Sequence, residues 1–220
     1  EIAQCLVGSE MCIRDRVHQI KTPLSVMRLQ LQSEDTPENR AMLAELFQME
    51  QYVTMALSYA RLGNPTKDLV LTRVPLDPVI RQAIRDFAPL LIRKKLRLQY
   101  EPTAESALTD SKWLLFILHQ LLSNAVKYTE RGRVSIRVTS APAIIVADTG
   151  IGIAPEDVPR VFEKGYTGYN GRGGQKSTGL GLYLVHQTAE MLHCRVSLSS
   201  RIGEGTSVTI DLHQEELGKE

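Results

Sequence analysis

Two runs of apolar residues with helical spacing lie in the first third of the chain. Within residues 17–31 and again within 42–60, apolar side chains recur at alternating gaps of three and four positions. A polar break separates the runs, and Thr36 and Pro37 suit the N-cap and first turn of the second helix. The pattern predicts an antiparallel hairpin with an uncovered apolar seam, so we expect a homodimeric four-helix bundle. The alternative is a monomeric hairpin packed on the rest of the chain.

After Pro65 the pattern changes to short strands that alternate with helices. We expect strands at residues 69–74, 96–101, 134–139, 144–147, 196–200 and 206–212, and helices at 77–93, 110–129 and 179–192. This order predicts an α+β protein, in which a helical hairpin precedes a two-layer α/β sandwich. The expected divisions are a doubtful segment 1–16, a hairpin domain 17–64, a linker with the first strand 65–73, a sandwich domain 74–213 and a tail 214–220.

Composition narrows the function classes. With 43% hydrophobic residues and a net charge of +1, the chain can form a core and has no general attraction to nucleic acid. Cys5, Cys12 and Cys194 match no zinc spacing and favour a reducing compartment. No apolar run approaches the ~20 residues that a membrane span needs, and no signal peptide is expected. Residues 5–16 resemble a translated sequencing adapter, so we expect them to be non-native and assign no function to Cys5 or Cys12.

A histidine lies at the edge of the first seam. His18 follows Val17, and Pro23 five residues later removes a backbone donor, so we expect the helix to bend there. A bend beside a nucleophile would give it room to move between partners. An ordinary surface histidine beside a kink is an equally good interpretation of these residues alone.

Amide, lysine and carboxylate side chains then recur near expected element ends. Asn124 and Lys127 follow Gln120 on one helical face, where an amide oxygen suits Mg²⁺ and a lysine suits phosphate. Asp148 ends an apolar strand and could accept a hydrogen bond from an exocyclic amine, as in adenine. Taken singly, the first group also fits a polar helix face, and Asp148 with its glycines fits an ordinary turn.

Glycines and basic residues surround the last expected helix. Gly150 and Gly152 allow a tight turn and close backbone approach to a ligand. Residues 165–178 are rich in glycine and basic residues and have no periodicity, which favours a lid. Arg172 and Lys176 in this stretch could reach a terminal phosphate, and the helix start that follows favours anions. A solvated flexible loop is the alternative.

Together, in this order and spacing, these motifs resemble the ATP-binding domain of the histidine kinases, which gyrase, the ninety-kilodalton heat-shock chaperone and mismatch-repair ATPases share. The matching stretches are 120–128 (N box), 148–152 (first glycine box), 161–166 (F box), 179–182 (second glycine box) and 203–206 (final glycine box). Residues 18–23 resemble the phosphoacceptor box of a bacterial sensor histidine kinase. Residues 162–172 are most similar to the kinases that partner ABC transporters in antimicrobial-peptide resistance.

The resemblance implies a two-component signalling enzyme. It would use ATP and Mg²⁺ to phosphorylate its own histidine, and would then pass the phosphoryl group to an aspartate of a response-regulator receiver domain. It would also have phosphatase activity toward that regulator. It implies the cytoplasmic part of a bacterial membrane protein, attached through an upstream segment. The implied catalytic residues are His18, Gln19 and Thr22. The implied nucleotide-binding residues are Asn124, Lys127, Tyr128, Asp148, Gly150, Gly152, Phe162, Lys164, Arg172, Lys176, Thr178, Gly179, Leu180, Gly181 and Thr206. Of these, Asn124 is also the implied Mg²⁺ ligand.

Two positions bear on the competing functions. Gln120 stands where ATP-hydrolysing relatives have a glutamate that activates water, so hydrolysis should be slow. Gln19 stands where the kinases usually have an acid beside the phosphoacceptor, and glutamine cannot take the imidazole proton. A weakly active ATP-binding dimeric scaffold and a gyrase- or chaperone-type ATPase are the alternatives to the kinase. The intact nucleotide boxes disfavour the scaffold, and Gln120 with the hairpin histidine disfavours the ATPase.

Overall fold

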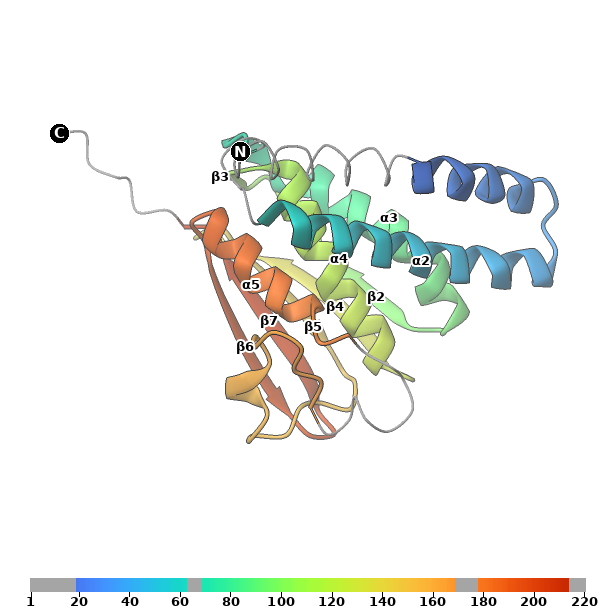
Figure 1. Cartoon of the computed structure of the whole chain (residues 1–220). Helices are drawn as coiled ribbons and strands as arrows, with labels where there is room; N and C mark the ends of the chain where they lie inside the picture. The colour runs from blue at the N-terminus through green and yellow to red at the C-terminus, as the bar shows by residue number, and fades with distance from the viewer. Residues whose placement is uncertain (1–18, 63–68, 169–177, 214–220) are drawn as a thin grey trace, which may run out of the picture. The chain divides into compact units, whose positions relative to one another are not determined.

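The computed structural model describes residues 19–62, 69–168 and 178–213, which fall into two compact units divided between Pro65 and Thr66 (Figure 1). Each unit is described by itself. Val17, His18 and the central part of the expected lid lie outside the described residues.

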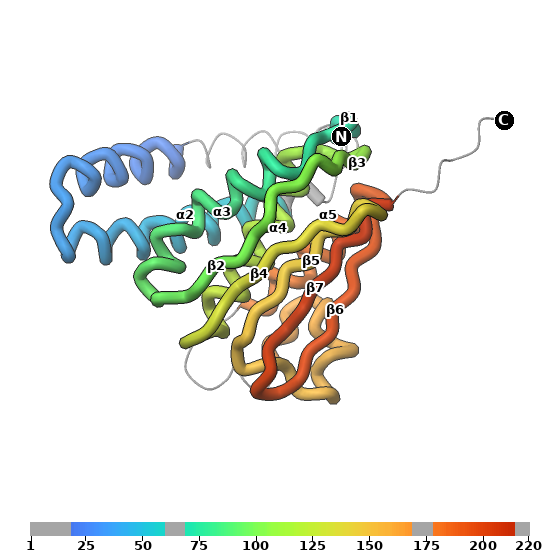
Figure 2. Tube along the Cα trace, turned by 180° about the vertical axis from the view of Figure 1, so that it is seen from behind, coloured from blue at the N-terminus to red at the C-terminus, as the bar shows by residue number. Residues whose placement is uncertain are grey.

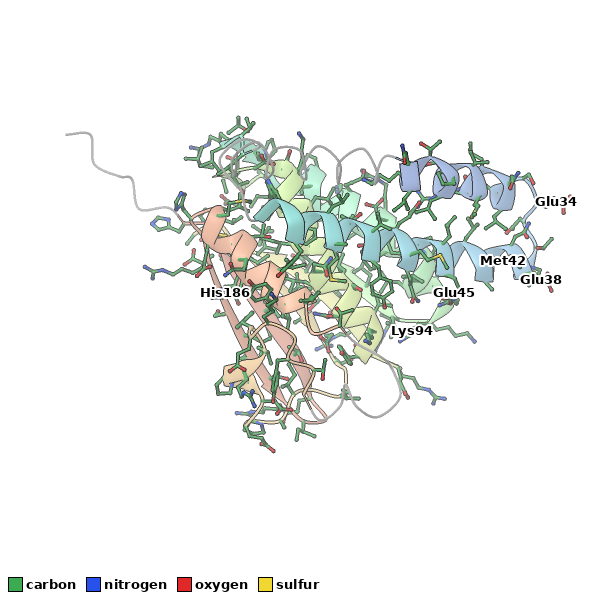
Figure 3. The ribbon with its side chains drawn as sticks, in the orientation of Figure 1. Glu34, Glu38, Met42, Glu45, Lys94 and His186 are labelled. Carbon is green, nitrogen blue, oxygen red and sulfur yellow. The ribbon has the colours of Figure 1, made fainter. Side chains whose placement is uncertain are left out.

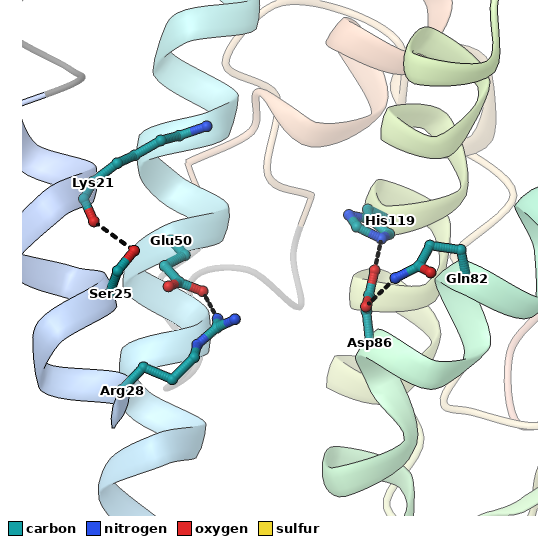
Figure 4. A network of polar contacts seen from close by, with 7 residues as sticks. All are labelled: Lys21, Ser25, Arg28, Glu50, Gln82, Asp86 and His119. Atoms are coloured by element: carbon teal, nitrogen blue, oxygen red, sulfur yellow. Dashed lines mark hydrogen bonds and ion pairs between the residues drawn. The ribbon is translucent and has the colours of Figure 1, made fainter. Parts of the chain in front are cut away.

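The first unit contains a helical hairpin, as the apolar spacing predicts. One helix covers residues 19–32 and the next, α2, covers Pro37–Leu62. The Oγ1 atom of Thr36 accepts a hydrogen bond from the Asn39 N–H at 3.1 Å, which confirms the expected N-cap. An ion pair between Arg28 and Glu50 joins the two helices (Figure 4).

Many apolar side chains of the hairpin are exposed in the single chain. Leu24 and Leu46 of the seam are buried, but Met42, labelled in Figure 3, is 57% exposed. The other exposed large apolar residues of the hairpin are Ile20, Val26, Met27, Leu29, Met49, Tyr52 and Tyr59. An apolar surface of this extent favours a partner helix pair. The homodimeric bundle remains a prediction.

The second unit is built on a five-stranded mixed sheet in the order β2-β4-β5-β7-β6. Its strands are β2 Arg97–Tyr100, β4 Arg133–Val138, β5 Ala143–Asp148, β6 Arg195–Arg201 and β7 Gly205–Asp211. β2 and β4 are parallel, and the remaining neighbours are antiparallel. Figure 2 shows the face of this sheet that is opposite to the helices. A separate two-stranded antiparallel sheet pairs β1 Thr72–Pro75 with β3 Ser106–Thr109.

Three helices cover one face of the large sheet (Figure 1). They are α3 Leu76–Arg93, α4 Ser111–Tyr128 and α5 Gly181–Met191. α4 and α5 pack on the strands, and α3 packs on α4. The fully buried side chains include Leu114, Ile117, Leu118 and Leu122 of α4, Ile136, Ile144 and Ile210 of the strands, and Leu184 of α5. The α+β class with a two-layer sandwich is confirmed.

A polar cluster joins α3 to α4 within the helix layer (Figure 4). The Nε2 atom of His119 lies 2.9 Å from an Asp86 carboxylate oxygen, and Gln82 donates to the same carboxylate at 2.8 Å. The ring of Phe87 packs edge-on against His119, with centroids 5.6 Å apart. Burial lowers the pKa of His119 although the Asp86 carboxylate opposes that shift.

The outermost strands carry arginines. Every second residue of β6 is exposed, beginning with Arg195 and ending with Arg201. β2, at the other edge, is only four residues long and exposes Arg97. The polar alternation places the apolar residues of each strand toward the helices.

Some element boundaries differ from the sequence-based expectations. The first strand begins at Thr72 rather than Leu69, and β3 and the 3₁₀ helix η2 Val158–Arg160 were not expected. α5 begins at Gly181 rather than Gly179, because Gly179 has a φ of +65° and cannot belong to a right-handed helix. Across the described residues, none of the helices combines the length and apolar character that crossing a membrane requires.

Candidate functional site

The amide side chains of α4 face the start of α5. Asp110 caps α4 by accepting hydrogen bonds from the N–H groups of Lys112 and Trp113. Gln120 is 6% exposed, and its Oε1 atom would lie 3.3 Å from a Cβ atom placed on Gly181. The Oδ1 atom of Asn124 would lie 4.0 Å from the same point. The fold therefore brings the N box and the second glycine box together.

The C-terminal end of α4 contacts the first glycine box. The carbonyl oxygen of Tyr128 accepts a hydrogen bond from the Ile151 N–H at 3.2 Å. It would lie only 2.5 Å from a Cβ atom on Gly150, so a side chain there would displace it. The Lys127 ammonium lies 5.2 Å from the centroid of the Tyr128 ring, and both residues are half-buried.

Asp148 is a half-buried carboxylate at the end of β5, as the sequence predicts. Its Oδ1 atom accepts a hydrogen bond from the Gly150 N–H at 2.8 Å. Burial raises the pKa of this carboxyl, and hydrogen bonds from the Gly150 and Thr206 N–H groups oppose the shift. The Thr129 hydroxyl also lowers this pKa, although it makes no hydrogen bond of good geometry.

Thr206 lies directly opposite Asp148 in the β5–β7 ladder. Its hydroxyl is 2.9 Å from that of Ser200, which also donates to the Gly205 carbonyl at 2.7 Å and accepts from the Ile153 N–H at 2.9 Å. Ser200 thus ties the final glycine box to Ile153, the residue that directly follows the first glycine box. No sequence motif marks Ser200, because two of its three partners are backbone groups.

Two glycines have backbone conformations that a side chain would not tolerate. Gly152 has a φ of +72°, and a Cβ atom there would lie 1.9 Å from the Arg201 carbonyl oxygen. Gly179 has a φ of +65°, and its Cβ atom would lie 2.4 Å from the Gly165 carbonyl carbon. Both positions require close contact between backbone segments, so glycine is needed at each.

The F box and the second glycine box are joined at their adjoining ends. The Gly165 N–H donates to the Gly179 carbonyl at 3.0 Å, and the Leu180 N–H donates to the Thr178 hydroxyl at 3.3 Å. Phe162 packs against His186 of α5, with ring centroids 5.4 Å apart. Lys164 is exposed, whereas Phe162 and Leu180 are half-buried. Arg172 and Lys176 lie outside the described residues.

The candidate catalytic residues are on the hairpin. Gln19 and Thr22 lie on the helix of residues 19–32, and both are exposed. His18 lies outside the described residues. The helix continues past Pro23, and the bend expected there stays a prediction.

The carboxyl and amide chemistry of the second unit fits a purine nucleotide with its phosphates. A half-buried carboxylate can accept from an exocyclic amine, while glycine backbone and a helix start favour anions. No group of three His, Cys, Asp or Glu side chains gathers as a metal site among the described residues. A lone amide oxygen fits Mg²⁺ that is otherwise held by phosphates and water. The residues present therefore fit a Mg²⁺–nucleotide complex.

Comparison with protein families and relatives agrees with this chemistry. Residues 109–216 match the family of histidine kinase-, DNA gyrase B- and HSP90-like ATPases. The chain is 36% identical over 203 residues to sensor protein BceS of Halalkalibacterium halodurans, covering 90% of the chain and 61% of that protein. It is 36% identical over 198 residues to sensor histidine kinase YxdK of Bacillus subtilis, covering 87% of the chain and 61% of the relative. The chain thus spans about three fifths of the length of these relatives.

Solved structures show the same fold. The full-length structure of ShkA in complex with AMPPNP has a TM-score of 0.61 and 26% identity, covering 91% of this chain and 45% of that one. The histidine kinase AdeS of Acinetobacter baumannii has a TM-score of 0.59 and 21% identity, covering 89% of this chain and 97% of that one.

Proposed function

We propose that the chain is the kinase part of a bacterial sensor histidine kinase, and that it transfers the γ-phosphoryl group of ATP to His18 and from there to an aspartate of a response-regulator receiver domain. The observation that supports this most directly is the convergence of Asp148, the Tyr128 carbonyl and the start of α5 around the glycine boxes.

In the proposed complex, Asp148 selects adenine. Its carboxylate accepts a hydrogen bond from the exocyclic amine, which guanine lacks at the equivalent ring position. One oxygen of the carboxylate is already held by the Gly150 N–H, so the group is oriented before the base arrives. The phosphates extend toward Gly179, Leu180 and Gly181, where backbone N–H groups at a helix start favour negative charge.

Charged and amide side chains then act on the phosphates. Asn124 offers its amide oxygen to Mg²⁺, which neutralises phosphate charge when bound. Lys127 approaches a phosphate as a point charge, and Arg172 and Lys176 from the lid stretch would reach the terminal phosphate. Phe162, Lys164, Thr178 and Thr206 complete the proposed site at its borders.

The reaction then forms a bond between the γ-phosphorus and an imidazole nitrogen of His18, and breaks the bond from that phosphorus to the bridging oxygen, so ADP leaves. A neutral imidazole is a competent nucleophile near pH 7. Gln19 can accept a hydrogen bond from the ring but cannot remove its proton. Gln120, which cannot act as a base toward water, supports transfer to histidine rather than hydrolysis.

Incubation with γ-labelled ATP and Mg²⁺ tests the proposal. Acid-labile label should appear on the chain and should be absent from the His18→Ala variant. Release of free phosphate without labelled protein would support the ATPase alternative instead. Nucleotide binding without label or hydrolysis would support the scaffold.

We also propose a phosphatase role for Thr22, which follows His18 in the sequence at the spacing of the phosphoacceptor box. A hydroxyl at this position can orient a water molecule toward the phosphorylated aspartate of a regulator. Thr22→Ala should retain self-phosphorylation but lose regulator dephosphorylation, measured with a purified phosphorylated receiver domain. Unchanged dephosphorylation would rule out this role.

The remaining assembly is proposed on the same basis. The exposed apolar residues of the hairpin support a homodimer, in which two hairpins form a four-helix bundle. By the same resemblance, the chain would be a cytoplasmic part anchored to a bacterial membrane through an upstream segment. The resemblance of residues 162–172 to transporter-partnered kinases supports an ABC transporter as a further partner. Sedimentation of the chain at several concentrations tests the dimer, since a monomer throughout would contradict it.

A further inference from the structure

All four carbonyl groups at the C-terminal end of α4 have donors. A helix leaves its last four carbonyls without partners of its own. Here the Ala125 carbonyl accepts from the Thr129 N–H at 3.1 Å, and the Tyr128 carbonyl accepts from the Ile151 N–H at 3.2 Å. The carbonyls of Val126 and Lys127 are left for a donor from elsewhere.

That donor is a lysine from another helix (Figure 3). The Nζ atom of Lys94 lies 2.5 Å from the Val126 carbonyl oxygen, 3.2 Å from that of Lys127 and 3.2 Å from that of Thr129. Three donors on one ammonium match three converging acceptors. Its positive charge also lies at the negative end of the α4 dipole, where cations are stabilising.

The backbone fixes the origin of this lysine. Lys94 is the C-cap of α3, and its N–H donates to the Leu90 carbonyl at 3.0 Å. Lys95 then turns the chain with a φ of +54°, so the two lysines project from different points of a tight turn. Lys94 is half-buried, whereas Lys95 is exposed.

The held segment is part of the site proposed for the nucleotide. Lys127 and Tyr128 belong to it, and the Tyr128 carbonyl is the partner of the first glycine box through Ile151. Without the ammonium, the carbonyls of Val126 and Lys127 would face a partly buried space without this donor, and the last turn of α4 would loosen. The Tyr128 carbonyl and the Lys127 side chain would then lose their fixed positions.

We propose that Lys94 is a positioning residue for nucleotide binding, because its ammonium holds the α4 terminus in the geometry that the first glycine box requires. This inference rests on the proposed function. It assigns to α3 a part in the site that none of the nucleotide boxes supplies.

The test compares four proteins of residues 1–220: the unaltered chain, Lys94→Met, Lys94→Arg and the matched control Lys95→Met. The dissociation constant for Mg²⁺–AMPPNP is measured by calorimetry, below the melting transition of every variant. KM for ATP and kcat for self-phosphorylation follow from initial rates. Lys94→Met should bind the analogue about tenfold more weakly, since hydrogen bonds to a charged group carry energy of that order.

The outcome separates positioning from a purely structural role. Positioning predicts that KM for ATP rises more than kcat falls, that Lys94→Arg recovers at least about half of the loss in log Kd, and that Lys95→Met stays within about twofold of the unaltered chain. A lower melting temperature in Lys94→Met with a dissociation constant equal to that of Lys95→Met would overturn the inference.

Three further results are decisive. If Lys94→Met is unfolded at the assay temperature, Lys94→Gln retains a shorter donor, and unaltered binding by that variant would overturn the inference. If the unaltered chain fails to bind the analogue, the proposed function itself is wrong. If the unaltered chain binds and Lys94→Met binds equally well, only the role of Lys94 is wrong.

Discussion

The substitution Asp148→Asn separates nucleotide recognition from stability. The two side chains have nearly the same shape, and an amide oxygen can still accept from the Gly150 N–H, which is 2.8 Å from Oδ1 in the unaltered chain. The amide nitrogen would then occupy the other carboxylate position and point a donor at the exocyclic amine of adenine. The variant therefore replaces the charged acceptor that faces adenine with a donor, and leaves the bond from the Gly150 N–H in place.

The expected loss of affinity follows from one hydrogen bond to a charged group. Such a bond contributes about 1.5–3 kcal/mol, which corresponds to a dissociation constant for ADP raised roughly 10- to 150-fold. Guanine has a carbonyl at the equivalent ring position, so the preference for ADP over GDP should narrow as well. Both constants are measured by calorimetry with Mg²⁺ at neutral pH.

Stability should not fall in this variant. Because burial raises the pKa of Asp148 above its usual value of 3.8, the folded state binds the proton more tightly than the unfolded state. The stability that this proton confers is complete below the unfolded pKa and is lost as the pH rises through the folded pKa. At neutral pH the ionised carboxylate is therefore a net cost, and the melting temperature of Asp148→Asn should equal or exceed that of the unaltered chain.

Asp211→Asn is the matched control. Asp211 also ends a strand of the same sheet, but it pairs with Ala143 at the opposite end of β5 from Asp148. This variant should bind ADP with unaltered affinity. Unaltered binding by Asp148→Asn, or an equal loss in both variants, would refute the reasoning about the carboxylate.

Three other substitutions test separate parts of the chain. Gln19→Glu supplies a base beside the phosphoacceptor and should speed self-phosphorylation, by at most roughly 10²–10⁴-fold; unchanged or reduced initial rates would count against it. Burial lowers the pKa of His119 below its usual value of 6.5, which also applies to the unfolded chain. The neutral form therefore contributes stability that is complete above pH 6.5 and is lost as the pH falls through the pKa of the folded state. His119→Gln should thus flatten the fall in melting temperature between about pH 7 and pH 5, and the exposed control His213→Gln should not. Gly150→Ala would place a Cβ atom 2.5 Å from the Tyr128 carbonyl oxygen, and should lower the free energy of unfolding by about 1–3 kcal/mol in denaturant titrations. An unaltered midpoint would show that the backbone yields there at no cost.

Local patterns were sufficient for most of the fold. The Asp110 cap and the apolar run after it predicted α4, and alternation predicted β4 and β7 to within a residue or two at each end. β3 was missed because Ser106–Thr109 contains only one β-branched residue and pairs with a strand more than thirty residues earlier. Such non-local pairing leaves no periodic signal.

The candidate site likewise has parts that the sequence predicts and parts that depend on distant contacts. The order of the motifs was sufficient to predict which residues form the nucleotide boxes. The structure brings Gln120, Asn124 and Gly181 together, as that order implies. Lys94 could not be predicted, because its three acceptors are backbone carbonyls on another helix. A carbonyl is present at every residue, so the sequence does not mark which ones a lysine will reach.

The arginines at both outer strands have a consequence for self-association. An uncovered strand edge can template another strand, which leads to sheet-to-sheet dimers and fibres. Here β6 exposes Arg195 and Arg201, and the short β2 exposes Arg97, so a second copy approaching edge to edge would bring like charges together. The sheet thus resists aggregation by charge, while the hairpin offers apolar side chains to a partner. Crowding of many such chains should therefore favour pairing through helices over polymerisation through strands.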